Sequence, residues 1–375
     1  MSPSLWSTAK VIFLTLAAGM MLGLGPASPP KRLPLVREAE FYEKLDRKLV
    51  RCRLCPRYCT IAPGQRGVCR VRENKDGKLY SVVYGRPCTI GKEPIEKAPF
   101  FHFLPGSSRI VLATAGCNQM CKYCQNWEIS QSSPEDLPNY DLPPESIVAI
   151  AKRENAPIVC FTFSEPIVFY EYMADIAQLC RKSGIRTAVV TGGYINPQPL
   201  SKLCSLVDAI KIDLKGFTDD FYRDVCSSSL EPVLEACKIV ARSPGIRRPV
   251  HLELVNLVVP ALNDDTAGLR KMCSWIRDSL GDTVPVHFTR FTPNYKLANS
   301  PPTPIATLER AAIIAKAAGI KYVYVGNVPG HWLENTYCPK CGKLLIKRQS
   351  YAVTENNIKN NCCRFCKTRI PGVWQ

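Results

Sequence analysis

The residues of this chain best suited to chemistry are three cysteines that lie close together in the sequence. Cys117, Cys121 and Cys124 have the spacing C-x3-C-x2-C, with Tyr123 before the last of them. Three thiolates can hold a four-iron cluster but leave one iron without a protein ligand, whereas an electron-transfer ferredoxin has every iron capped by cysteine. The open iron is then free to bind a small chelating molecule. A zinc loop or a group of buried thiols is the alternative interpretation of this spacing.

A second group of cysteines precedes the first. Its four members are spaced C-x2-C-x3-C-x9-C, and proline and glycine at 63–67 provide the turns that would let them converge. The group predicts a second metal site, for zinc or for a second iron–sulfur cluster, and redox-active or buried thiols are the alternative. Spacing alone does not choose the metal. The four residues are Cys52, Cys55, Cys59 and Cys69.

The tail contains two C-x2-C pairs separated by 21 residues, Cys338 with Cys341 and Cys363 with Cys366. This pattern predicts a zinc ribbon, with a rubredoxin-like iron as the chemical alternative. Four cysteine ligands leave no open position, so we expect a structural role. Cys362 could replace Cys363, but the two-residue gap to Cys366 favours Cys363.

Composition limits the remaining classes. The chain has 375 residues, 46% of them hydrophobic, which is enough for one barrel and accessory modules. Nineteen cysteines, an odd number, mostly in metal-type spacings, indicate metal binding in a reducing compartment rather than a disulfide framework. The net charge of +17 is concentrated on the two cysteine-rich flanks. A basic flank can bind nucleic acid, but we favour charge balance with metal-bound thiolates and do not expect nucleic acid as a partner.

The cysteine loop needs a scaffold that positions it. From residue 110 onward, short apolar segments alternate with segments of helical periodicity. This alternation predicts an α/β fold, a parallel sheet covered by helices, and six to seven repeats predict a partial or full barrel. The expected strands are 110–113, 158–161, 188–190, 209–214, 251–258, 286–291 and 322–325, and the expected helices are 144–154, 167–182, 198–206, 231–242, 265–279 and 304–318.

Polar residues and glycines stand where these strands end. In a barrel such ends surround one cavity, where a cofactor would find hydrogen-bonding groups and charges. The alternative is that Asp213 and Lys215 form an internal ion pair and that His251 and His287 belong to the core. The residues are Ser164 and Glu165, Thr191 and Gly192, Asp213 and Lys215, His251 and Glu253, and His287 and Arg290.

The fourth strand allows a sharper expectation. Side chains alternate between the faces of a strand, so Asp213 and Lys215 share the face toward the cavity and Leu214 has the opposite one. Lys211 has the same parity as the pair but lies deeper, where an unpaired ammonium is costly to bury. We expect it near the barrel's N-terminal mouth, or paired.

The first 30 residues contain an apolar run that ends in a Gly/Pro-rich stretch. The run, 11–24, reaches about 21 Å as a helix, short of a bilayer core of about 30 Å. The basic residues that follow it favour the cytoplasmic side, as does the need for a low-potential reductant. We therefore expect a cytoplasmic protein with at most a membrane anchor at 5–24; a misassigned start and export are the alternatives. The expected modules are 1–30, a Cys-rich module at 31–105, a barrel at 106–330 and a zinc-ribbon-like tail at 331–375.

The cysteine loop resembles that of the radical S-adenosylmethionine (SAM) superfamily. Over 41–374 the chain resembles, more narrowly, the radical SAM enzymes of the AmmeMemoRadiSam system, relatives of the pyruvate formate-lyase activating enzymes. The motifs are CRLCP at 52–56, PGQRGVC at 63–69, PIEK at 94–97, FHFLPGS at 101–107, CQNW at 124–127, FTPNY at 291–295 and YVGNVPG at 324–330, together with the two cysteine pairs of the tail.

The resemblance implies that the three cysteines of the loop ligate a [4Fe-4S] cluster. The open iron would bind the amino and carboxylate groups of SAM, and electron transfer would break its sulfonium C–S bond to give a 5′-deoxyadenosyl radical. Tyr123 would lie near the adenine, and the segment of Ser164 and Glu165 would receive the ammonium group through its backbone. Asp213 and Lys215 match a pair that contacts the cofactor.

One short segment departs from the family pattern. Thr191-Gly192-Gly193 stands where Asn-Gly is expected. The resemblance therefore places Thr191 and Gly192 at the cofactor without implying a side-chain contact from position 192.

These implications lead to two function classes. The first is a radical enzyme that abstracts hydrogen from a protein, such as a glycyl Cα, or from a small molecule. The second is an iron–sulfur and zinc protein for electron transfer or binding that does not cleave SAM. The implied partners are a low-potential electron donor such as flavodoxin or ferredoxin, and proteins of the Memo and AMMECR families. The substrate does not follow, because the cofactor performs the abstraction and the pocket only positions a C–H bond.

Overall fold

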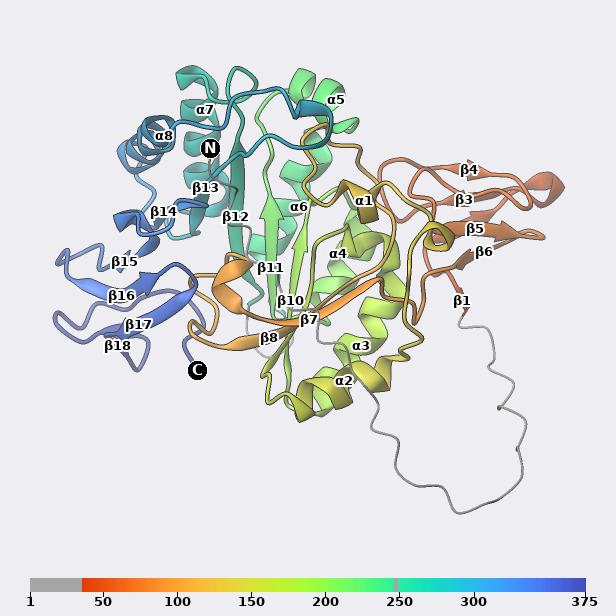
Figure 1. The fold of residues 1–375 in the computed structure, drawn as a ribbon, viewed down its shortest axis with the longest axis horizontal. Helices are drawn as coiled ribbons and strands as arrows, with labels where there is room; N and C mark the ends of the chain where they lie inside the picture. Colours follow the sequence, from red (N-terminus) through yellow and green to blue (C-terminus); the bar gives the residue numbers. More distant parts are fainter. Residues whose placement is uncertain (1–35, 246–248) are drawn as a thin grey trace, which may run out of the picture. The chain divides into compact units, whose positions relative to one another are not determined.

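The structure is a computed structural model that describes residues 36–245 and 249–375. Its centre is an eight-stranded sheet of order β14-β13-β12-β11-β10-β9-β8-β7 (Figure 1). Neighbours from β8 to β14 are parallel and follow each other in chain order, and β7 is antiparallel to β8. The strands are β7 (Thr89–Pro94), β8 (Ser108–Ala113), β9 (Ile158–Phe161), β10 (Arg186–Thr191), β11 (Ala209–Asp213), β12 (His251–Val258), β13 (Val286–Arg290) and β14 (Val323–Gly326). The predicted partial barrel is confirmed, with β7 and β14 as its two edges.

Helices connect the parallel strands and cover the outer face of the sheet (Figure 1). Outward side chains such as Ile110, Leu112, Val189 and Ile210 share one large core with them. The helices are α1 (Trp127–Ser130), α2 (Pro144–Arg153), α3 (Tyr170–Lys182), α4 (Pro197–Cys204), α5 (Asp219–Cys226), α6 (Glu231–Arg242), α7 (Thr266–Leu280) and α8 (Ile305–Ala317). Proline begins α2 and α4, where its missing N–H costs no hydrogen bond. The sequence did not predict α1, α5 or β7.

Two small modules of short strands flank the sheet. The first has two three-stranded sheets, and the second carries the tail. Their strands are β1 (Arg37–Glu38), β2 (Tyr42–Lys44), β3 (Val50–Cys52), β4 (Thr60–Ile61), β5 (Arg72–Lys75) and β6 (Lys78–Ser81), then β15 (Thr336–Tyr337), β16 (Leu344–Gln349), β17 (Ala352–Asn356), β18 (Ile358–Lys359) and β19 (Cys362–Cys363). Strand β7 lies in the stretch expected to form the first module, but it pairs with the barrel sheet.

The described residues contain no helix that is both long and apolar enough to cross a membrane. The apolar segment 5–24, for which we expected an anchor at most, lies outside the described residues.

The N-terminal end of the barrel is closed by the segment that follows β7. Ile95, Phe100 and Phe103 pack against inward residues of the strands, among them Val111 and Ala188. Within the described residues, this packing fills the N-terminal end of the barrel. A ligand would therefore bind at the opposite end, among the loops that follow the carboxyl ends of the strands. A barrel fold places its chemistry at that end.

A buried carboxylate fixes the closing segment. Glu253 on β12 accepts the backbone N–H groups of Phe101 and His102, at 3.0 and 2.8 Å. His251 and His287 direct their Nε2 atoms at the same carboxylate, at 2.9 and 2.6 Å. Burial alone would raise the pKa of Glu253, but the two histidines lower it well below its usual range. The two histidines therefore belong to the core, and they do not join the cofactor site.

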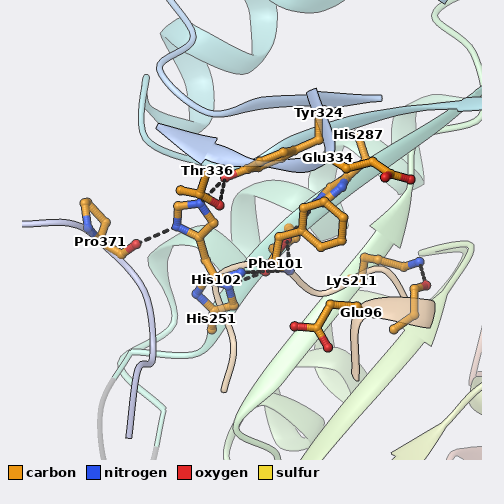
Figure 2. Close-up of polar contacts among 12 residues, drawn as sticks. Glu96, Phe101, His102, Lys211, His251, His287, Tyr324, Glu334, Thr336 and Pro371 are labelled. Carbon is orange, nitrogen blue, oxygen red and sulfur yellow. Dashed lines mark hydrogen bonds and ion pairs between the residues drawn. The ribbon is translucent and has the colours of Figure 1, made fainter. Parts of the chain in front are cut away.

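The tail is attached to the same segment. Arg348 on β16 is buried and donates to the Phe101 carbonyl at 2.8 Å, with its guanidinium over the Phe101 ring. His102 contacts the Pro371 carbonyl and the Tyr324 hydroxyl, at 2.7 and 2.6 Å (Figure 2). Burial lowers the pKa of His102 to about 3, so this ring is neutral and bridges two modules without a charge.

Lys211 lies inside the barrel, on the face predicted for it. Its ammonium group donates to the carbonyl of Ala98 in the closing segment. The expected partner is therefore present, but it is a backbone carbonyl rather than an acid. Burial lowers the pKa of Lys211 to about 8.

This shift predicts a measurable pH dependence of stability. Between about pH 8 and the model-compound value of 10.5, the unfolded chain holds a proton at position 211 that the folded chain has lost. Stability rises with pH wherever the unfolded state binds more protons. In chemical unfolding experiments, the free energy of unfolding of the wild type should therefore rise by roughly 3 kcal/mol relative to Lys211→Met across this window. The exposed Lys271→Met is the control, and a difference that stays flat with pH would contradict the buried ammonium.

Candidate active site

The cysteine loop follows β8 directly and is held by close backbone contacts. Gly116 has φ +94°, and a Cβ atom there would lie 2.5 Å from the carbonyl oxygen of Cys69. Only glycine fits this conformation and this approach. The loop then runs against the end of α5, where Met120 and Lys122 donate to the carbonyls of Cys226 and Val225 at 3.0 and 2.9 Å.

The three cysteines of the loop face inward. Cys121 is buried, and Cys117 and Cys124 are partly buried. Burial raises the pKa of Cys117 and of Cys124, and a hydrogen bond with Cys226, followed by burial, raises that of Cys121. The three sulfurs do not gather as the ligands of one ion do, since in the described part of the chain only the tail quartet has all its ligand atoms within 4.8 Å.

Glu165 organises the ends of β9 and β10. Its buried carboxylate accepts the Thr191 hydroxyl at 2.6 Å and the backbone N–H groups of Gly192 and Ile167 at 2.8 and 3.2 Å. Burial nevertheless raises its pKa, against these hydrogen bonds. At position 192 a Cβ would lie 2.2 Å from the Gln119 amide oxygen, so glycine lets the cysteine loop approach Glu165. Three of the predicted cofactor residues are thus brought together beside the loop.

The backbone between β9 and Glu165 is strained. Phe163 has φ +67°, which is uncommon for a bulky residue, and its carbonyl accepts the Asn126 amide at 2.9 Å. Ser164 follows, and its hydroxyl is buried without a hydrogen-bond partner among the described residues. Such an orphaned donor is expected where a polar ligand binds. Ser164, the fourth predicted cofactor residue in this region, therefore has a free hydroxyl group that a cofactor could bind.

Asp213 and Lys215 lie on the cavity side of β11, as predicted. Their carboxylate oxygen and ammonium nitrogen are 3.3 Å apart, so the ion-pair alternative describes their state in this structure. Burial would lower the pKa of Lys215, but Asp213 and the thiols of Cys121 and Cys226 raise it well above its usual value. The Lys215 ammonium group therefore keeps its proton next to the cysteine loop, where Asp213 balances its charge.

Some residues of the site were not predicted. Cys226, at the end of α5, lies beside Cys121, and the Tyr123 hydroxyl is 3.6 Å from its sulfur. Gln119 donates to Ser228 at 2.8 Å, and Asn118 donates to the Tyr194 carbonyl at 2.7 Å. Asn118, Gln119 and Asn126 lie in the predicted loop, whereas Cys226 stands in no metal spacing. Contact of Tyr123 with adenine stays a prediction.

The tail quartet forms a second kind of sulfur site. Cys338 and Cys366 have their sulfurs 3.5 Å apart, and those of Cys341 and Cys363 are 3.8 Å apart. Tetrahedral zinc with Zn–S bonds of about 2.3 Å needs sulfur separations of about 3.8 Å. Hydrogen bonds from Thr368 lower the pKa of Cys366 to about 6, which favours the thiolate that a metal requires. The quartet fits one ion.

The N-terminal quartet does not close in this way. Cys52, Cys55, Cys59 and Cys69 instead line one cavity between the N-terminal module and the cysteine loop. Its lining includes Asn118 of the loop.

The chain is similar to several known proteins. The family model of the radical SAM superfamily matches residues 111–273. An uncharacterised protein of Methanocaldococcus jannaschii, MJ0808, is 48% identical over 340 residues, which cover 90% of this chain and all of that protein. The pyruvate formate-lyase 1-activating enzyme of Escherichia coli K12 is 25% identical over 58% of this chain and 92% of its own length. Among solved structures, a radical SAM methyltransferase from Sphaerobacter thermophilus matches with a TM-score of 0.46 and 17% identity, over 60% of this chain and 67% of that one.

The tail geometry predicts which of two adjacent cysteines is a ligand. In the full-length protein, Cys363→Ser should remove about one equivalent of zinc or iron and lower the melting temperature, because a module this small has little core of its own. Cys362→Ser is the matched control, since Cys362 is the neighbour outside the quartet. Metal analysis decides the matter, and equal metal content in the two variants would contradict the assignment.

Proposed function

Because the chain belongs to the radical SAM superfamily and is homologous to the pyruvate formate-lyase activating enzymes, we propose that it is an enzyme that cleaves SAM reductively and abstracts hydrogen from a substrate. The observation that carries the proposal is the set of three inward thiols at the open end of a partial barrel, spread more widely than the ligands of one ion. A [4Fe-4S] cluster with bound SAM would supply a 5′-deoxyadenosyl radical there.

The surrounding residues have roles that suit the two charged ends of SAM. The unpartnered Ser164 hydroxyl and the backbone of the Glu165 segment are suited to receive the ammonium group. The raised pKa of Glu165 indicates a carboxyl group whose charge lacks compensation, and a cationic ligand would provide it. Lys215 is suited to attract the carboxylate. The ring of Tyr123, at the base of the loop, is the candidate contact for adenine.

A narrower assignment is also part of the proposal. Motifs that the chain shares with the AmmeMemoRadiSam system support membership in that group, and with it proteins of the Memo and AMMECR families as partners or substrates. A flavodoxin or ferredoxin would deliver the low-potential electron. At the rim of the open end, Trp127 stacks on Tyr295 with ring centroids 5.1 Å apart, and Trp127 is 38% exposed. An exposed aromatic rim supports a protein segment as substrate, as in the activating enzymes.

SAM cleavage is the first test. The reconstituted and reduced protein should convert SAM to 5′-deoxyadenosine, measured by chromatography. Cys117→Ala, Cys121→Ala and Cys124→Ala should each abolish the product, because three ligands are the minimum for a cluster with one open iron. Cys88→Ala is the control, since that thiol lies outside the three cysteine groups and donates to the Ala113 carbonyl. A protein that carries the cluster but makes no 5′-deoxyadenosine would instead be an electron-transfer or binding protein.

Lys215 provides a second, independent test. If its ammonium binds the SAM carboxylate, Lys215→Ala should weaken SAM binding by about ten- to a hundredfold, the effect of roughly 1.5–3 kcal/mol, while the cluster spectrum stays unchanged. Lys122→Ala, which removes an exposed charge from the cysteine loop, should bind SAM normally. Calorimetric titration and a thermal melt are run on both variants. Unchanged affinity with a lower melting temperature would leave Lys215 a structural residue only.

A further inference from the structure

We propose that Cys52, Cys55, Cys59 and Cys69 hold a second iron–sulfur cluster, and that this cluster passes electrons from an external donor to the site on the Cys117 loop. The metal assignment does not depend on the proposed function. The direction of electron flow rests on the proposed function.

The first observation is the cavity that the four cysteines surround. Its remaining wall combines apolar residues, Leu54, Ile61 and Val168 among them, with polar and charged ones. A single ion needs its four thiols close together, as they are in the tail quartet, where the sulfur distances are 3.5 and 3.8 Å. In the described residues the N-terminal quartet has no such gathering within 4.8 Å. Four thiols spread around a cavity suit a cubane, in which four irons keep the ligands apart.

The second observation is a buried cation without full compensation. Arg72 lines the cavity and is 1% exposed. Its Nη2 donates to both oxygens of Glu171, at 2.8 and 2.7 Å, but its Nε and Nη1 are buried without a partner among the described residues. An orphaned guanidinium donor is costly to bury, so it indicates an anionic acceptor in the cavity. A cluster capped by four thiolates is anionic, and hydrogen bonds to its sulfurs tune its reduction potential.

The third observation is the wall that this cavity shares with the active site. The carbonyl of Cys69 abuts Gly116, next to Cys117, and this contact is why position 116 must be glycine. Arg57 lines the cavity and donates to the carbonyl of Asn118 at 3.0 Å and to that of Ser227. Asn118 lines the cavity too, and its amide oxygen has no partner in the described part of the chain. The residues on both sides of Cys117 therefore touch the second site.

The geometry also gives the site its role. Four cysteine ligands cap every iron, so the second cluster cannot bind SAM and is suited to electron transfer. Its outer side reaches the surface, since Cys59 is only partly buried and the adjacent Tyr58 is 46% exposed. In each turnover a low-potential flavodoxin or ferredoxin would lose one electron, which reduces the second cluster and then the first. That electron is consumed when SAM is split into methionine and the 5′-deoxyadenosyl radical.

The metal assignment is tested in a full-length variant that keeps the N-terminal quartet intact. Cys117→Ala, Cys121→Ala and Cys124→Ala are combined, and the protein is reconstituted with iron and sulfide under anaerobic conditions. We expect about four sulfides per chain and about four irons beyond any single iron in the tail quartet, and a reduced EPR signal that SAM does not alter. A folded variant that retains zinc but no sulfide-bound iron would overturn the proposal. A loss of 5′-deoxyadenosine formation alone would not, because that result concerns the first site.

The relay is tested in the wild-type protein, so that no variant has to fold. The protein is mixed with reduced flavodoxin in less than stoichiometric amount and frozen at successive times for EPR. The SAM-insensitive signal should appear first and decline as the SAM-sensitive signal grows. The reverse order, or two signals that rise independently, would exclude the relay. Dithionite, which is small enough to reach both sites, is the control and should remove the sequential order.

Discussion

The barrel depends on the carboxylate of Glu253, which is buried inside the protein. An ionised carboxyl group inside a protein costs several kcal/mol unless partners compensate it. Glu253 has four such partners: two backbone N–H groups of the closing segment, and one histidine from each of two adjacent strands. Removing any one of the four would leave the buried carboxylate with less compensation and so destabilise the fold. The closing segment is therefore tied to β12 and β13, and the tail is tied to the closing segment through Arg348.

A second buried carboxylate, that of Glu165, is compensated less completely than that of Glu253. Glu165, at the other end of the barrel, has three donors and no histidine, and burial raises its pKa, whereas the pKa of Glu253 is lowered. Glu253 is satisfied by the fold itself and has no need of a ligand. Glu165 lies beside the cysteine loop, a strained Phe163 and an unpartnered Ser164. Incomplete compensation of this kind is typical of binding sites, because the ligand supplies what the fold leaves out.

The parts of this arrangement that were predictable are those encoded locally. Cysteine spacing, strand alternation and side-chain parity placed the loop, the parallel order of the strands and the inward Asp213 and Lys215. The rest depends on contacts between residues far apart in the chain. Glu253 meets Phe101 from 152 residues away, and β7 has no pattern that separates it from the strands of the small module. Cys226 belongs to no motif, and only the fold brings it to Cys121.

Cysteine spacing also has a limit that these sites make visible. Cys52 with Cys55 and Cys338 with Cys341 share the same C-x2-C spacing, and the sequence allowed zinc or iron at both. In the folded chain, short antiparallel strands bring the two tail pairs together until their sulfurs nearly touch. In the N-terminal module Cys52 ends β3 and the other three cysteines lie in the loops beside the short strands, and the wall is completed by Arg72, Val168 and Asn118 of the Cys117 loop. The same C-x2-C spacing therefore leads to two different arrangements of thiols, and only the contacts that form in the folded chain separate them.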